Sequence, residues 1–277
     1  LVTHVCGDEG KMTLAPGRQS SRFESYTDWE LAVVDTSPAD HDLEFRVPQS
    51  QLQRLHDGRS QLWQDPGLPF DVRLSNYYRN ANVVRAAGLP NPPTPVIGDF
   101  FIAPLPVDKQ AERNFPAMHV TLVDCQTGSE RTEILWGASA RPLVVEVEGR
   151  RFEISLRHVT WTLPFAIELE KFTAEFHPGT DRPRHFQSDV VKIDADGERQ
   201  RTIIRMNEPL RTEGYVFFQA SYQQDPATGE FLSTLAVTRN PADQVPLYAC
   251  VIVTAGMVIH FGMRLNLHLK RERQVTA

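Results

Sequence analysis

The strongest constraint on this chain is an uncharged apolar run near its C-terminus, from Pro246 to Met263. Its eighteen residues contain no Asp, Glu, Lys or Arg, and only His260 titrates near neutral pH. As a helix, a run of this length just crosses the hydrocarbon core of a bilayer. A buried core helix at the end of a soluble domain is the alternative, but core helices this long usually carry a polar face. The sequence therefore predicts a membrane helix at residues 246–263.

The charges that flank this run are unequal. Asp243 and Gln244 precede it, Arg264 follows it directly, and the tail then carries Lys270, Arg271 and Arg273. Because basic residues accumulate on the cytoplasmic side of membrane helices, the tail at 264–277 is expected in the cytoplasm. Everything before the run is then expected on the extracytoplasmic side.

The remainder of the chain favours β structure, because short alternating or β-branched runs are separated by turn residues. Four pairs of runs flank turn signals and predict hairpins: 119–123 with 132–136, 143–147 with 152–156, 189–193 with 202–206, and 215–222 with 231–237. One short helix is expected at Pro48 to His56. The predicted fold class is mainly β, a β-sandwich or barrel-like outer domain with one C-terminal transmembrane helix.

A proline-rich stretch from Gly88 to Pro106 interrupts the β pattern, and its six prolines exclude a regular helix or a central strand. On either side of it lie similar LPF segments, Leu68 to Tyr77 and Leu163 to Phe172. They suggest two related lobes, each opening a strand after a proline-fixed entry. The expected domains are an N-terminal β lobe at 1–87, a linker at 88–106, a second β lobe at 107–245, the membrane helix at 246–263 and a basic tail at 264–277.

Charge and motifs exclude several function classes. The net charge of -6 and pI near 5.9, with Arg and Lys spread evenly, argue against a nucleic-acid partner. The segment Gly7 to Lys11 lacks the spacing and the hydroxyl residue of a phosphate loop, and Asp194 to Glu198 lacks the distal Glu of a calcium loop. Hydrolase and dehydrogenase motifs are also missing from the sequence. We expect that the chain is not an enzyme.

Three cysteines carry little information. No CxxC or CxxCH motif is present, so the chain does not attach a c-type haem covalently. Cys6 and Cys125 could form a disulfide in an oxidising compartment, but free or buried thiols fit equally well.

Several segments follow one another in a set order between Leu163 and Tyr222. They are the Leu163-Pro164-Phe165 entry, the turn at 176–180, Phe186-Gln187-Ser188-Asp189, Met206-Asn207-Glu208-Pro209-Leu210 and the strand from Gly214 to Tyr222. In this order they resemble the signature region of the ResB-like family. The segment from Leu68 to Asn80 is similar to an earlier LPF segment of that family. Gly179 and Gly214 lie at expected turns, so we expect these motif residues to have a structural and not a catalytic role.

The resemblance implies a protein of System II cytochrome c maturation in the bacterial inner membrane, with its large domain on the periplasmic side. It implies a scaffold that assists haem delivery or presentation to apocytochrome c with a CcsA-type partner, which performs most of the chemistry. Any haem would be bound without a covalent link. One alternative is a structural subunit of a membrane redox or multihaem complex that binds mature c-type cytochromes. Another is a membrane-anchored β domain that binds carbohydrate or peptide.

The sequence offers three candidate cofactor-binding residues. An imidazole in hydrocarbon is costly and can ligate a metal, so His260 is a candidate axial ligand of haem iron, with a hydrogen bond to a neighbouring helix or snorkelling as the alternative. Arg182 and Arg184 could bind a haem propionate or an acidic partner, although a solvated loop has the same composition. The family's usual intramembrane histidine lies in earlier helices that these residues do not include. Other histidines, at 119, 158, 177, 185 and 268, are expected on the surface or in turns.

Overall fold

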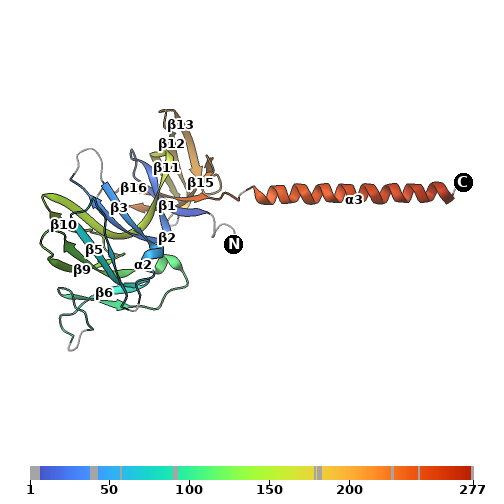
Figure 1. The fold of residues 1–277 in the computed structure, drawn as a ribbon. Coiled ribbons are helices and arrows are strands. Elements are labelled where there is room, and N and C mark those ends of the chain that lie inside the picture. The colour runs from blue at the N-terminus through green and yellow to red at the C-terminus, as the bar shows by residue number, and fades with distance from the viewer. Residues whose placement is uncertain are drawn as a thin grey trace. The chain divides into compact units, whose positions relative to one another are not determined.

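Strands make up most of the protein, and one long helix follows them at the C-terminus (Figure 1). The computed structural model describes residues 7–37, 43–56, 58–89, 93–177, 179, 183–225, 228–242 and 244–275. The predicted fold class, mainly β with one C-terminal apolar helix, is confirmed.

The chain divides into two units that interleave along the sequence. The C-terminal unit comprises Leu1–Glu9, Thr13–Gln19 and Ile167–Ala277, and the central unit comprises Gly10–Met12 and Ser20–Ala166. This division differs from the two expected lobes. The proline-rich stretch at 88–106 lies inside the central unit, because strand β5 (Phe70–Tyr78) before it pairs with strand β8 (Ala117–Asp124) after it.

The central unit contains two facing sheets. One sheet has the strand order β4-β5-β8-β9. In the other sheet β2 and β11 are neighbours, β3 pairs with β2, and β10 pairs with β11. Apolar side chains from both sheets, among them Leu31, Phe70 and Phe152, form one buried cluster. The remaining elements are β2 (Gln19–Asp35), β3 (Leu43–Pro48), α2 (Gln49–Leu52), β4 (Ser60–Trp63), β6 (Ala81–Arg85), β7 (Phe100–Pro104), η1 (Ala111–Arg113), β9 (Glu130–Trp136), β10 (Leu143–Val147) and β11 (Arg150–Phe176).

The C-terminal unit contains a buried ring of polar side chains among apolar core residues such as Ile204, Phe217 and Leu235. Ser188 Oγ donates to Gln219 Oε1 at 2.6 Å, Gln219 Nε2 donates to Ser233 Oγ at 3.0 Å, and the two serine hydroxyls lie 2.7 Å apart. These bonds join the β12-β13 pair to the β14-β15-β16 meander. The strands are β1 (Asp8–Leu14), β12 (Pro183–Ile193), β13 (Arg199–Arg205), β14 (Leu210–Thr212), β15 (Tyr215–Gln224) and β16 (Phe231–Arg239).

All four predicted hairpins are present, as β8-β9, β10-β11, β12-β13 and β15-β16. The second LPF segment does not open a strand, because Leu163-Pro164-Phe165 lies inside the long strand β11. Leu163 and Phe165 are buried there and Pro164 is exposed, so the alternation simply continues through the proline. The expected helix at 48–56 is one turn, α2, followed by a turn.

Helix α3 runs from Val245 to Val275, and Val245–Asn266 is long and apolar enough to cross a membrane. Its mean hydropathy is 1.8, and none of its apolar window is buried by the part of the chain that the structure describes. The alternative of a buried core helix therefore does not hold for this structure. A helix that is apolar all round and exposed all round requires an apolar solvent or partner.

Candidate functional site

His260 lies on the apolar segment of α3 and is exposed. Its ring contacts Phe261 edge to face, with centroids 5.8 Å apart, and no described residue outside the helix covers this segment. The imidazole is therefore accessible, and none of the described residues outside the helix covers it.

Arg184 is exposed on β12, and Arg182 lies outside the described residues. Arg184 and Phe186 share one face of β12, because they are two positions apart on a strand. Phe186 belongs to a group of four rings that approach one another at centroid distances of 5.2 to 6.4 Å: Phe172, Phe186, Tyr222 and Phe231. We call this group the aromatic end of the C-terminal unit. A guanidinium beside such rings can bind a flat apolar group that carries an acid, or an acidic peptide.

His260 and Arg184 do not come together in the structure. The aromatic end lies at the start of β16, and the nine residues of β16 carry the chain about 30 Å away before α3 begins. If both residues contribute to haem binding, they act at separate places.

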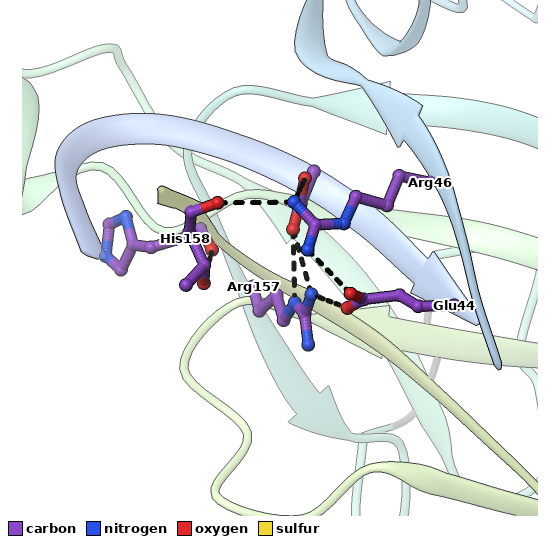
Figure 2. Close-up of polar contacts among 6 residues, drawn as sticks. Glu44, Arg46, Arg157 and His158 are labelled. Carbon is purple, nitrogen blue, oxygen red and sulfur yellow. Dashed lines mark hydrogen bonds and ion pairs between the residues drawn. The ribbon is translucent and has the colours of Figure 1, made fainter. Parts of the chain in front are cut away.

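A group of ion pairs on strands β2, β3 and β11 of the central unit was not anticipated (Figure 2). Arg157 Nη2 donates to Glu30 Oε1 at 3.1 Å and also to Glu44, and Arg46 Nη2 donates to Glu44 Oε2 at 2.6 Å. Arg46 Nη1 lies 3.8 Å from Glu30 Oε2 and donates to the carbonyl oxygen of Thr160 at 3.2 Å. Two guanidiniums and two carboxylates thus bind one another across three strands. We call Glu30, Glu44, Arg46 and Arg157 the Arg-Glu network.

The carboxylates of the Arg-Glu network are largely shielded from water, and its two guanidiniums are about one-third exposed. The Glu30 side chain is 5% exposed and the Glu44 side chain 17%. Burial raises the pKa of Glu44, but the hydrogen bond from Arg46 and the charge of Arg157 outweigh it, so the pKa is lowered overall. Because the network satisfies its own charges, it ties strands together and is not suited to hold a ligand.

Two histidines expected on the surface are partly or fully enclosed. His158 stacks on Trp29 with ring centroids 3.9 Å apart, and Figure 2 shows it pointing away from the Arg157 side chain. Asn76 Nδ2 lies 3.1 Å from His119 Nδ1, and His119 is 4% exposed. Burial lowers the pKa of both imidazoles, which keeps them neutral at pH 7. The expectation of surface positions was wrong for these two, because their side chains fall on covered sheet faces.

The enclosed histidines do not fit a haem iron. The ring atoms without a protein partner, His119 Nε2 and His158 Nδ1, are themselves buried. His260 fits better, since its ring is exposed on an apolar helix. Within the described ranges, no group of three or more His, Cys, Asp or Glu side chains is placed to hold a metal ion.

The chain is similar in sequence to known proteins. Residues 117–232 match the model of the ResB-like family. The chain is also 30% identical, over 263 residues, to protein NrfI of Wolinella succinogenes; the match covers 93% of this chain and 25% of that protein. The chain thus spans about a quarter of the length of this relative. From the ordered motifs, the family match and the fold, residues 117–232 of the chain form a ResB-like region.

Proposed function

We propose that this chain is the outer domain and a membrane anchor of a protein that takes part in the maturation of c-type cytochromes. The observation that carries the proposal is a ResB-like β domain joined directly to an exposed apolar helix of membrane-spanning length. Such a helix fixes the domain at a membrane surface, where a maturation complex that moves haem outward must work.

The domain acts as a scaffold that helps a CcsA-type partner deliver or present haem to apocytochrome c. The exposed His260 supports this role, because an imidazole in hydrocarbon needs a partner from another helix. When haem is bound, neutral imidazole can serve as an axial ligand of its iron. The aromatic end, with Arg184, offers a second surface where a carboxylate of haem or of an acidic peptide could bind.

The chain is oriented with its β units on the periplasmic side of the inner membrane. Basic residues follow the span, and the segment before it carries Asp243 and Gln244. The positive-inside rule then places the C-terminus in the cytoplasm. A C-terminal reporter that is active only outside the cytoplasm would reverse this orientation.

Purification of the tagged full chain from its native membrane tests the scaffold role. We expect a CcsA-type protein to co-purify, and deletion of the chain to abolish covalent haem attachment to c-type cytochromes, measured by haem staining. Stoichiometric binding to mature cytochromes, with normal haem attachment in the deletion strain, would instead make the chain a structural subunit of a redox complex.

His260→Ala tests the haem ligand in the same purified complex. We expect less haem per mole of complex, measured by Soret absorbance, with partial recovery when imidazole fills the open axial position. Thr254→Ala is the matched control, because the Thr254 hydroxyl donates to Cys250 O of its own helix at 2.7 Å. Unchanged Soret absorbance in His260→Ala would remove His260 as a ligand and leave the scaffold role intact.

A further inference from the structure

A pocket of about 580 Å³ lies in the C-terminal unit beside the start of α3. Its wall is formed by the β14-β15 hairpin, the end of β16 and the residues that lead into the helix. The lining includes Glu9, Arg211, Tyr215, Phe218, Asn240 and Gln244. The volume lies within the range of pockets that enclose a small molecule.

One residue of the lining, Gln244, indicates that the pocket lies at the membrane surface. Gln244 is the last residue before the candidate span, and its carbonyl accepts a bond from Tyr248 N at 3.2 Å, so the first turn of α3 begins there. One residue covers less than about 4 Å, so this rim lies at the edge of the hydrocarbon, in the headgroup layer. A ligand of this pocket can therefore be a molecule of the bilayer itself.

The β14-β15 hairpin gives the pocket a firm edge. Glu213 and Gly214 both have positive φ, 50° and 80°, as the tightest hairpin turns require. Lys192 Nζ contacts Glu213 Oε1 and Asp194 Oδ1, each at 2.7 Å, which holds the turn against β12. The edge is therefore set before any ligand binds.

The lining combines opposite charges with apolar surface. Arg211 supplies a guanidinium, which binds phosphate oxygens in bidentate fashion, and Glu9 supplies a carboxylate. The rings of Phe218 and Tyr215 and the ring of Pro241 supply apolar wall. The carboxylate of Glu213 is a second negative group, although Lys192 offsets it. Because the lining carries both positive and negative groups, it disfavours binding of an anionic headgroup and favours a headgroup that carries both charges.

We propose that the pocket binds the headgroup of a zwitterionic phospholipid with a primary ammonium group, of the phosphatidylethanolamine type. The phosphate binds Arg211, the ammonium binds Glu9, and the acyl chains run along the apolar surface of α3. The inference rests on the part of the proposed function that anchors α3 in a membrane, and it is independent of haem and of the CcsA-type partner. Failure of lipid binding would therefore leave the scaffold role untouched.

Native mass spectrometry of the full chain in detergent, with one added lipid at a time, tests this inference. We expect retained phosphatidylethanolamine in excess over phosphatidylglycerol and phosphatidylcholine. Arg211→Ala should lower retention about tenfold, as loss of a charge-assisted hydrogen bond does, and Glu9→Gln should reduce the preference for the ethanolamine headgroup. Soluble phosphoethanolamine, which lacks acyl chains, should not compete at equal concentration.

Arg201→Ala is the matched control. Arg201 lies on β13 of the same unit, its side chain is 80% exposed, and it pairs with Glu170 at 2.9 Å. The Arg201→Ala variant should retain as much lipid as the wild-type chain. Equal retention of the three lipids by the wild-type chain, or wild-type retention by Arg211→Ala, would overturn the proposal. So would loss of all bound lipid when the partner complex is kept intact, because a partner helix would then fill the pocket.

Discussion

The two units satisfy their buried polar groups in different ways. The Arg-Glu network of the central unit consists of four charged side chains, whereas the ring of Ser188, Gln219 and Ser233 in the C-terminal unit is neutral. The C-terminal unit also contains a charged group, the buried Lys192 with Asp194 and Glu213. Charges lose much more hydration free energy on burial than amides or hydroxyls, so breaking one charged pair leaves a larger penalty. Mutation of one member of the Arg-Glu network should therefore destabilise the protein more than mutation of one member of the neutral ring. Of these two groups, only the Arg-Glu network can respond to mild acid.

The composition provides a way to observe the units separately. All four tryptophans, Trp29, Trp63, Trp136 and Trp161, belong to the central unit. Tryptophan fluorescence therefore reports unfolding of the central unit, and far-ultraviolet circular dichroism reports strands of both units.

Arg157→Leu should give the largest effect. Among the described residues, Arg46 at 3.8 Å is then the one cation that remains near the buried Glu30, and we expect the free energy of unfolding to fall by about 3 kcal/mol. The measurement is urea denaturation of the full chain in detergent, followed by tryptophan fluorescence. The control is Arg131→Leu, whose surface pair with Glu133 at 2.8 Å should contribute less than about 1 kcal/mol. Equal effects of the two substitutions would mean that the Arg-Glu network is not shielded.

Gln219→Leu should have a smaller effect, a loss of about 2 kcal/mol. The two serines that remain can still bond to each other, because their hydroxyl oxygens are 2.7 Å apart. Circular dichroism should record the loss. A simultaneous shift of the tryptophan transition by the same amount would show that the units unfold as one, and a separate transition would show that they unfold independently.

Each unit has a two-residue Glu-Gly hairpin turn, so the same glycine substitution can be made in both units. Glu148-Gly149 joins β10 to β11 and Glu213-Gly214 joins β14 to β15, and both glycines have positive φ, 75° and 80°. Valine is poorly tolerated at positive φ, so Gly149→Val and Gly214→Val should each cost about 1–2 kcal/mol and lower the yield of folded protein. Gly179, with φ of 74°, should behave in the same way. Normal yields and melting temperatures would contradict the turn assignment.

Acid should produce the smallest effect, and tryptophan fluorescence should detect it in the central unit. The pKa of Glu44 and of Asp35 is lowered in the folded state; burial opposes this shift, and hydrogen bonds from Arg46 and Arg150 outweigh it. A lowered pKa contributes stability above the unfolded values of 4.5 and 3.8, and this stability is lost as pH falls through the folded pKa values. Urea midpoints read by tryptophan fluorescence should therefore decline below about pH 4.5. A midpoint that is independent of pH down to pH 3 would contradict the shielding of these carboxylates.

Local features of the fold could be predicted from the sequence, and non-local ones could not. Each hairpin was predictable because its two runs and its turn are contiguous. The pairing of β5 with β8 across the proline-rich stretch was not, because no local signal records which distant strands meet. The same limit explains why the expected lobes differ from the observed units.

Among the candidate sites, too, local features could be predicted from the sequence and contacts between distant residues could not. The apolar span and His260 stand out in the sequence, because a membrane imposes a length and a composition. The Arg-Glu network was missed because its members are up to 127 positions apart. One signal was available: Glu30 begins the run Leu31-Ala32-Val33, which is buried on both faces, and a carboxylate in such a run requires a cation.

The interleaving of the two units also sets an order of events during synthesis. Strand β1 neighbours β16, and the hydroxyls of Thr13 and Thr234 lie 3.1 Å apart across 221 positions. At 5–20 residues per second, β1 waits roughly 10–40 s for this neighbour to be made. Strand β16 is synthesised just ahead of helix α3. The C-terminal unit therefore closes last, and its first strand keeps an open edge that can aggregate or engage a chaperone until β16 is synthesised.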